Sequence, residues 1–502
     1  MSPILVLVLL ATPIIWFLLH KRGQQSIRLP FPPGPPGLPL IGNILTIPAK
    51  GAWLLFSELH THLGSLLFFH GLGNNILVLN ELTIINDLLD KNGEIYAHRP
   101  ILTVLGELMG LNRSMPLLPY GKEWRSQRRL VHSALSNTAV VKYRRLQEDL
   151  TSQMLLDLVE KPEDFFAHVR LYAERIILMI TYGLPINVAD NEYITHAEAT
   201  MHVIGEAMVP GAFLCDLIPW MRYLPSWISF QVKAAEGRSM IENMVQKPFD
   251  HVKQNIAEQT AGPSLMHDLL NIGGLEDRTS LEHSVKWATG SMYGAGGETT
   301  YATILTFMLA MALNPDKQEL SQAEVDRVVG SDRLPTVADM SDMPYVVAVI
   351  KETLRWHPAL PLGIARYTQQ DSIYKGYHLP RNSVVIPNIW SICQQPHTKY
   401  DAKCFIPERF LDRNSGVIDP TTYVFGFGRR ICPGKALAEN SLFAAVAGIL
   451  ATFTMSRVPG DKLVPKFGQA LVSYPEPFRC KIRPRSESKV LLVQNRVAQC
   501  KV

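Results

Sequence analysis

The sequence predicts a mainly α-helical protein with a minor β region, and two observations lead to this prediction. Helical patterns fill most of the 502 residues, whereas strand patterns are confined to residues 66–79 and 374–386. No long linker, low-complexity tract or obvious repeat divides the chain after residue 50, and 47% of the residues are hydrophobic, which is enough for one sizeable core. We therefore expect a single domain at 49–502, preceded by N-terminal segments at 1–22 and 23–48.

The segment 1–22 has the character of a membrane anchor. Residues 3–19 are almost entirely apolar, and at about 1.5 Å per residue they span roughly 26 Å, close to a thin bilayer core. A cleaved signal peptide is the alternative, but the basic residues Lys21 and Arg22 follow the apolar run, and no small-x-small site ends it. The positive-inside rule puts these two residues in the cytoplasm. The proline-rich segment 23–48 then favours a stiff hinge.

Charge and cysteine content exclude several classes of protein. A net charge of +4 is too small to indicate nucleic-acid binding, although it suits a membrane surface or an acidic protein partner. The six cysteines include no Cys-x-x-Cys pair, and a chain of this length needs no disulfide bonds. We therefore expect a reducing compartment and no zinc site.

Within the domain, the patterns predict local elements in the following order. They are a helix at 53–63, a β-hairpin at 66–79, a helix at 83–91, a long central helix at 285–313, two short strands at 374–386 and a buried helix at 436–450. Residues 96–119 lack a clean periodicity. Residues 210–230 combine several prolines with Trp220 and Trp227, which fits either a buried loop or a segment at a membrane interface.

Trp124 and Arg128 are four residues apart, so they share one face of a helix. The indole N–H and the guanidinium can both donate hydrogen bonds to one carboxylate. The alternative is an amphipathic helix with one aromatic anchor and solvated arginines.

The central helix contains Gly294, Gly296 and Gly297, followed by Glu298 and Thr299. Each glycine costs about 1 kcal/mol relative to alanine inside a helix, and such a cost usually has a packing or functional reason. One interpretation is a kink packed against a neighbouring helix, with Glu298 in a structural ion pair.

Glu352 and Arg355 are three residues apart on a predicted helix, and the sequence Pro-Glu-Arg-Phe follows at 407–410. A pair with this spacing lies on one face of the helix. Such pairs are common at protein surfaces and are worth little there.

The stretch from Phe425 to Gly434 turns sharply around its glycines and then begins a helix. Cys432 therefore lies beside a helix N-terminus, where free N–H groups and the helix dipole favour the thiolate. A thiolate beside guanidinium groups suits a redox metal with acidic side arms, such as haem iron held by cysteine. The alternative is a cysteine that acts as a small buried hydrophobe.

The pattern Phe-x-x-Gly-x-Arg-x-Cys-x-Gly is met at every fixed position between Phe425 and Gly434. It resembles the haem-binding loop of the cytochrome P450 monooxygenases. The anchor, the proline-rich hinge, Trp-x-x-x-Arg, Ala-Gly-x-Glu-Thr-Thr, Glu-x-x-Arg and Pro-Glu-Arg-Phe all follow in the family's order. The resemblance covers nearly the whole chain and is closest to fungal microsomal members of secondary metabolism. The one departure is Glu298, where aspartate is commoner.

The resemblance implies the α-rich cytochrome P450 fold, haem b as cofactor and Cys432 as the iron ligand. It implies Thr299 and Glu298 as catalytic residues that guide protons to oxygen, on a helix that is locally opened. The cofactor-binding residues that it implies are Cys432, Trp124, Arg128, Arg366, Arg430, Phe425 and Gly434. It also implies a structural triad of Glu352, Arg355 and Arg409, and a loop at 467–477 that reaches back into the active site.

The implied reaction inserts one atom of O2 into a C–H bond of a small molecule. No Gly-x-Gly-x-x-Gly follows a strand, so a separate NADPH–cytochrome P450 reductase is expected to supply electrons, with cytochrome b5 as an optional second donor. The expected location is the endoplasmic reticulum membrane, with a single N-terminal anchor and a cytosolic domain.

The positions that resemble the active-site lining are apolar and indicate a neutral, apolar substrate. They are Gly294, Ala295, Leu360, Leu362 and Ile364. A terpenoid is the leading class, and an aromatic or indole compound or a polyketide is the alternative. A different class of function is a non-oxidising haem-thiolate isomerase, carrier or sensor. The presence of both Glu298 and Thr299 argues for monooxygenation.

Overall fold

The structure is a computed structural model that describes residues 29–39, 41–186, 188, 191–208, 212–271 and 278–500. The anchor expected at 1–22 and the start of the hinge, 23–28, lie outside the described residues. In the described part of the chain, no helix has the length and the hydropathy that a membrane crossing requires.

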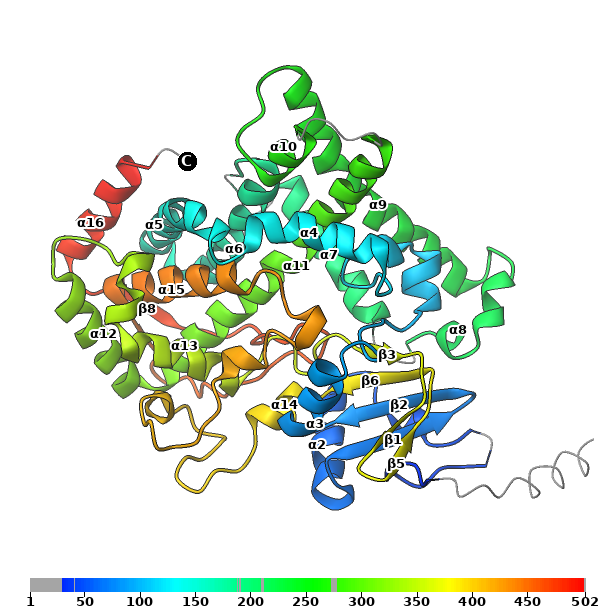
Figure 1. Ribbon diagram of the computed structural model, residues 1–502. Helices are drawn as coiled ribbons and strands as arrows, with labels where there is room; N and C mark the ends of the chain where they lie inside the picture. Colours follow the sequence, from blue (N-terminus) through cyan, green and yellow to red (C-terminus); the bar gives the residue numbers. More distant parts are fainter. Residues whose placement is uncertain are drawn as a thin grey trace, which may run out of the picture.

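Helices make up most of the molecule, as predicted, and α11 runs through their middle (Figure 1). The longer helices are α2 (Ala52–Leu63), α4 (Lys122–Leu135), α5 (Arg144–Glu160), α6 (Phe165–Tyr182), α7 (Glu192–Ala207), α9 (Ser229–Ala257), α11 (Arg278–Leu313), α12 (Pro315–Val329), α13 (Pro344–Trp356), α15 (Lys435–Thr452) and α16 (Glu487–Ala498). The shorter ones are α3 (Leu82–Ile85), α8 (Leu214–Leu217), α10 (Leu265–Leu270) and α14 (Ile389–Cys393). The helices predicted at 53–63, 83–91, 285–313 and 436–450 are therefore confirmed, the second as α3 continued by a π-helical segment at Asn86–Lys91.

Most of the strands gather beside the helical part, together with α2, α3 and α14, whereas β8 lies among the helices near α12 and α15 (Figure 1). The predicted hairpin is formed by β1 (Leu66–Gly71) and β2 (Asn74–Leu79). The prediction of two strands at 374–386 is wrong in detail. That region forms the hairpin of β4 (Ser372–Tyr374) and β5 (Tyr377–Leu379), and then β6 (Ser383–Pro387) leaves it to pair in parallel with β2.

The sheet order β1-β2-β6-β3 places β3 (Arg366–Thr368) at one edge, antiparallel to β6. The apolar residues of β6 explain why this strand pairs with the distant β2 and not with the neighbouring β4–β5 hairpin. Val385 and Ile386 become buried when they pair with the equally apolar β2, which returns more free energy than a solvent-exposed hairpin edge would. A separate ribbon pairs β7 (Phe453–Ser456) with β8 (Lys481–Pro484).

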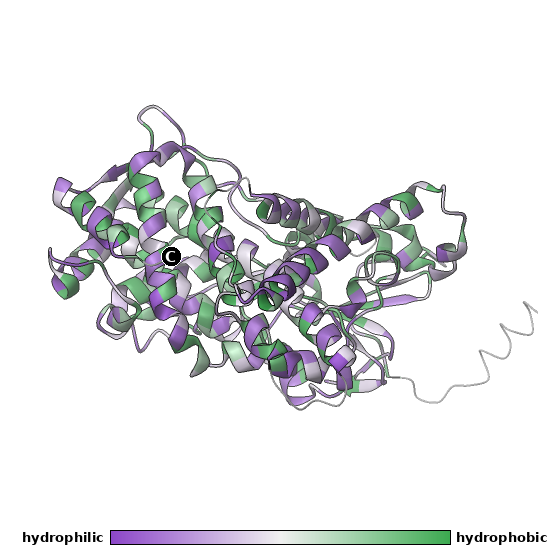
Figure 2. Cartoon of the chain, turned by 90° about the horizontal axis from the view of Figure 1, so that it is seen from above, coloured by the Kyte–Doolittle hydropathy of each residue, from purple (hydrophilic) through white to green (hydrophobic). Residues whose placement is uncertain are grey.

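The core of the helical part is built around two almost wholly apolar helical stretches. Residues 301–312 of α11 and 440–452 of α15 are buried without exception. A helix that is apolar on all sides must be enclosed by other helices, whereas the outer helices alternate hydrophobic and hydrophilic residues (Figure 2). This packing fixes α11 between α6 and the cysteine loop that precedes α15.

The predicted triad of Glu352, Arg355 and Arg409 is present and buried. The two carboxylate oxygens of Glu352 accept from Arg355 Nε at 2.7 Å and Nη2 at 2.8 Å, and Arg409 Nε lies 3.1 Å from Oε2. The backbone N–H of Ile406 donates to the same carboxylate at 2.7 Å. The triad therefore ties α13 to the segment that leads into the cysteine loop, and the interpretation of an ordinary surface pair is wrong.

Candidate active site

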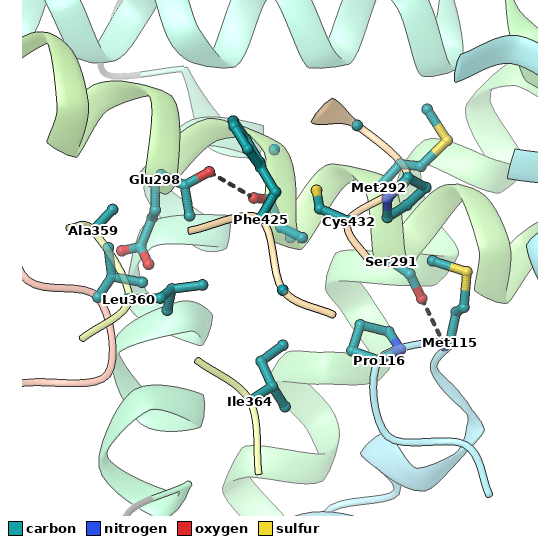
Figure 3. Close-up of a pocket in the computed structure, with 18 of the residues that line it drawn as sticks. Met115, Pro116, Ser291, Met292, Glu298, Ala359, Leu360, Ile364, Phe425 and Cys432 are labelled. Atoms are coloured by element: carbon teal, nitrogen blue, oxygen red, sulfur yellow. Dashed lines mark hydrogen bonds between the residues drawn. The ribbon is translucent and has the colours of Figure 1, made fainter. Parts of the chain in front are cut away.

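A cavity of about 360 Å³ lies between α11, α4 and the cysteine loop. All nine residues that the sequence singled out line it. They are Trp124, Arg128, Glu298, Thr299, Arg366, Phe425, Arg430, Cys432 and Gly434. Figure 3 shows Glu298, Phe425 and Cys432 around this space. Residues from four distant parts of the chain thus meet in one place.

The cysteine loop owes its shape to two glycines in the left-handed region. Gly426 has φ of 84° and Gly428 has φ of 47°, a conformation that other residues adopt only with strain. A Cβ at Gly428 would also lie only 2.6 Å from the carbonyl oxygen of Leu89. The loop closes where the N–H of Cys432 donates to the carbonyl of Phe425 at 2.8 Å, and α15 begins three residues later.

The thiol of Cys432 faces two opposing influences. Burial raises its pKa, while the backbone N–H of Gly434 and the charge of Arg128 lower it. Burial is the largest of these causes, so the pKa is raised overall, although the N–H of Gly434 at the start of α15 acts in the expected direction and favours the thiolate. A bound metal cation would supply the missing charge, because a coordinating thiol loses its proton on binding.

Four arginines line the cavity, and none of them forms an ion pair with the described residues. They are Arg99, Arg128, Arg366 and Arg430. Burial and the neighbouring cations lower the pKa of Arg430 to about 8 and that of Arg366 to about 9. A cluster of buried cations without an acid is costly unless an anion joins it. Two propionate groups of a haem would supply such anions, so the residues present fit this cofactor.

Backbone carbonyls hold three of these arginines in place. Arg430 donates to Ala97 O at 2.8 Å and to Leu118 O at 2.6 Å, and its guanidinium lies 4.5 Å from the centre of the Trp124 ring. Arg366 donates to Phe427 O at 2.8 Å. These contacts fix the geometry of the cluster before any ligand is added.

Arg99 is a site residue that the sequence analysis missed. It donates to the carbonyls of Pro116, Ile364 and Ala365, each at 2.7 Å, and is almost fully buried. It thereby joins two segments of the cavity wall. Its stretch, 96–119, lacks a clean periodicity, so the only available signal was a charged residue within a largely apolar stretch.

The expected local opening of α11 is not found, because the helix is continuous from Arg278 to Leu313. The hydroxyls of Thr299 and Thr300 donate back to carbonyls one turn earlier, at 3.4 and 3.1 Å. Side chains of α6 also fill the space beside two glycines. A Cβ at Gly296 would lie 2.8 Å from Ile177, and a Cβ at Gly297 would overlap the carboxyl group of Glu174.

The glycines of α11 therefore have two different roles. Gly296 and Gly297 allow α6 to approach closely, and Gly294 and Gly296 line the cavity. The ion pair of Glu298 that the alternative interpretation called for is absent among the described residues, and the nearby Arg170 pairs with Glu198 instead. Burial instead raises the pKa of Glu298, and Arg170 partly offsets this.

The rest of the lining is mostly apolar. Gly294, Ala295, Leu360 and Ile364 line the cavity as predicted, but Leu362 does not, because it packs against the hydrophobic cluster behind the sheet. The tail loop reaches the cavity through Leu471 and Val472, as expected. The sequence analysis missed five methionines in the wall: Met115, Met201, Met208, Met244 and Met292.

Comparisons with known proteins agree with this geometry. The family model "Cytochrome P450" matches residues 32–482. Cytochrome P450 monooxygenase COX2 of Coprinopsis cinerea is 39% identical over 93% of this chain and 90% of its own length. Cytochrome P450 monooxygenase claR of Ampulloclitocybe clavipes is 37% identical over 95% of this chain and 90% of its own length.

Among solved structures, a zebrafish cytochrome P450 with progesterone matches with a TM-score of 0.70 and 26% identity, covering 86% of this chain and 99% of that one. The fold, the cavity with its cysteine loop and the full-length likeness to fungal enzymes all agree. This chain belongs to the cytochrome P450 family, and it is a cytochrome P450 monooxygenase.

Proposed function

We propose that this monooxygenase oxidises a neutral, hydrocarbon-rich small molecule, with a terpenoid as the leading class. The observation that carries the proposal is the lining of the cavity away from the arginine cluster. Methionine, leucine and isoleucine side chains dominate it, and Glu298 is the single carboxylate in the wall among the described residues. An unpaired charge on a substrate would be very costly in such surroundings.

The polar side chains in this wall are already used within the protein. Ser291 Oγ donates to Trp287 O at 2.6 Å and accepts from the N–H of Met115 at 3.1 Å (Figure 3). Ser114 Oγ donates to Leu111 O at 2.7 Å. Few free hydrogen-bonding groups are left to select a polar substrate, which supports recognition by shape and apolar contact.

The family implies a haem-thiolate cofactor, and we propose that Cys432 is its iron ligand. Arg99, Arg128, Arg366 and Arg430 would hold the propionates. When bound, the haem activates dioxygen so that one oxygen atom enters a C–H bond of the substrate. Glu298 and Thr299 lie in the cavity wall, where their carboxyl and hydroxyl groups would pass protons into the cavity.

The relatives bear on the substrate only in part. One solved zebrafish relative contains progesterone, a neutral hydrocarbon-rich molecule. The five methionines of this chain give a second candidate class, because thioethers pack favourably against aromatic rings and adapt to irregular shapes. A neutral aromatic compound, an indole or a polyketide is therefore the alternative substrate.

A ligand titration of the purified haem-loaded protein tests the substrate class. The panel contains terpenoids, neutral aromatics, fatty acids and amines. We expect neutral terpenoids to shift the Soret band to shorter wavelength and to be turned over. Turnover restricted to the charged compounds would overturn the proposal.

The variant Cys432→Ala tests the iron ligand. We expect it to lose the absorption band that a thiolate-ligated haem gives in its reduced carbon monoxide complex, while far-UV circular dichroism stays close to that of the unaltered protein. A variant that keeps the band would show that another residue holds the iron.

We also propose an anchor in the endoplasmic reticulum membrane, with the domain in the cytosol and electrons from an NADPH-dependent reductase. The sequon Asn112-Arg113-Ser114 offers a test, because Asn112 is exposed. Expressed in a eukaryotic host, the protein should carry no glycan at Asn112. A glycosylated Asn112 would reverse the proposed orientation.

A further inference from the structure

A second carboxyl group lies directly behind the helix that carries Glu298. Glu174 is on α6, its side chain is 6% exposed, and it does not line the cavity. Its carboxyl group packs against the backbone of Gly297, the residue immediately before Glu298. Because Gly297 has no side chain, the space beside its Cα is free, and the Glu174 carboxyl group occupies it.

The hydrogen bonding of Glu174 is incomplete. Its Oε2 is buried and has no hydrogen-bond partner among the described residues. A buried carboxylate in this state would be expensive, whereas a protonated carboxyl group is not charged and can donate. The geometry alone thus favours a neutral acid at this position.

The charged groups around Glu174 favour the same state. Arg170 lies one turn earlier on α6, and Glu198 of α7, Glu298 of α11 and Tyr293 of α11 are the other titratable groups that interact with it. Burial, together with the charges of Glu298 and Glu198, raises the pKa of Glu174 to about 8, and Arg170 offsets only part of this. When two carboxyl groups share one site, one of them keeps its proton.

The cluster reaches from the cavity to the surface. Arg170 connects α7 with α11. It forms an ion pair with Glu198 of α7 at 3.2 Å, and its guanidinium lies 4.1 Å from the centre of the Tyr301 ring of α11. The side chain of Glu198 is 49% exposed, so that end of the cluster exchanges protons with water. Glu298 forms the other end, in the cavity wall.

We propose that Glu174 is a proton reserve for Glu298, so that two carboxyl groups in series, rather than one, supply protons to the cavity. The inference rests on the proposed role of Glu298 and Thr299. Glu174 gives the proton of its O–H group to the Glu298 carboxylate through bridging water, and Glu298 passes a proton to the cavity by way of the Thr299 hydroxyl. Glu174, left as a carboxylate, regains one proton from solvent at the Glu198 end, so one proton enters for each proton delivered.

The first test is spectroscopic and does not depend on turnover. Infrared spectra of the haem-loaded protein should show the C=O stretch of a protonated carboxylic acid at about pH 6 that disappears by about pH 10. The isosteric variant Glu174→Gln should lack this band at both pH values, whereas Glu198→Gln, at the exposed end, should keep it. If Glu174→Gln does not fold, Glu174→Ala takes its place, because burial also raises the pKa of other carboxyl groups such as Glu298 and Asp216, and the band must be assigned to Glu174. A spectrum without a protonated carboxylic acid at the lower pH overturns the proposal.

The second test is the ratio of product formed to NADPH consumed, measured against pH. In the unaltered protein this ratio should fall as pH rises through the range in which Glu174 loses its proton. We expect Glu174→Gln to have a ratio several-fold lower at neutral pH, with little remaining pH dependence. Glu174→Asp, which restores an acid, should recover part of the ratio.

The variant Glu298→Gln separates this inference from the proposed function. If Glu298→Gln lowers the ratio and Glu174→Gln does not, Glu174 does not supply protons to Glu298, and the proposed role of Glu298 stands. If neither variant changes the ratio, the role of Glu298 fails, and the inference fails with it. A carbon monoxide spectrum of each variant shows that the haem is bound in the same way.

Discussion

Two buried clusters of charge in this molecule differ in how completely their polar atoms are paired. In the triad, the Glu352 carboxylate meets two arginines, and Arg355 also donates to the carbonyls of Cys393 and Ala402 at 2.8 and 2.9 Å. In the cluster behind the cavity, the single cation Arg170 pairs with Glu198, Glu174 and Glu298 form no ion pair among the described residues, and one oxygen of Glu174 has no hydrogen bond there.

This difference separates structural charge from functional charge. A fully paired buried cluster has no proton to give, and it holds two segments together. A cluster with too few cations has raised carboxyl pKa values, and such values are typical of groups that exchange protons during catalysis. The predictions below test this contrast and are ordered by the size of the effect on stability.

The largest effect is expected for Glu352→Gln. The change leaves the buried guanidinium groups of Arg355 and Arg409 without an acid, and breaking such a pair typically costs about 3–5 kcal/mol. The free energy of unfolding, from urea denaturation followed by tryptophan fluorescence, should fall by this amount. The control is Lys142→Ala, which removes an exposed pair with Asp268 and should change little. Similar losses of free energy in both variants would mean that the triad does not stabilise the fold more than an exposed ion pair does.

The next effect is a pH dependence that comes from Glu174. Its pKa is raised from 4.5 to about 8 in the folded protein. The folded state therefore binds this proton more tightly than the unfolded state, so the contribution to stability is complete below about pH 4.5 and is lost as pH rises through about 8, at a slope of at most ~1.4 kcal/mol per pH unit. Glu174→Gln should remove this slope. Parallel stability curves for the two proteins would contradict the prediction.

A smaller effect is expected for Gly297→Ala, because the new methyl group would overlap the Glu174 carboxyl group. Overpacking of this kind typically costs about 1–3 kcal/mol. The cost should shrink when Glu174→Ala is present as well, which a double-mutant cycle measures. Gly205→Ala is the matched control, because Gly205 also lies inside a helix, α7, and the nearest atom to a Cβ there is Leu471 Cβ at 4.0 Å. Equal costs in both backgrounds would argue against this packing.

The smallest effect on stability is expected for Thr299→Ala. Its hydroxyl makes only a long hydrogen bond of 3.4 Å to the carbonyl of Ala295, so its loss should cost little free energy. The ratio of product formed to NADPH consumed should nevertheless fall, with the difference appearing as hydrogen peroxide. An unchanged ratio would remove Thr299 from proton transfer.

The parts of this protein that the sequence could predict are those with short spacings. Trp124 and Arg128 share a helix face because they are four residues apart, and the cysteine loop carries all its glycines within ten residues. The order of such motifs identified the family as well as the position of the cavity. In the triad, Arg409 is the only member that is distant in sequence from Glu352, and the family resemblance predicted that it belongs there.

The parts that could not be predicted depend on contacts between distant elements. A lone glutamate on α6 normally points to solvent, and its burial follows only from the glycine opposite it on α11. The same glycines led to the expectation of an opened helix, because the sequence does not show which neighbour fills the space beside them. Leu362 was misplaced for a similar reason, since the sheet behind it takes its side chain.

The parallel pairing of β2 with β6 has a consequence for synthesis of the chain. The two strands are separated by roughly 300 residues, so at about 5–20 residues per second the ribosome needs on the order of 15–60 s to deliver the partner. During that time the apolar edge of β2 is open to mispairing with other chains. Nascent copies of this protein should therefore bind holdase chaperones until β6 emerges, and slower translation of the intervening helices should increase aggregation.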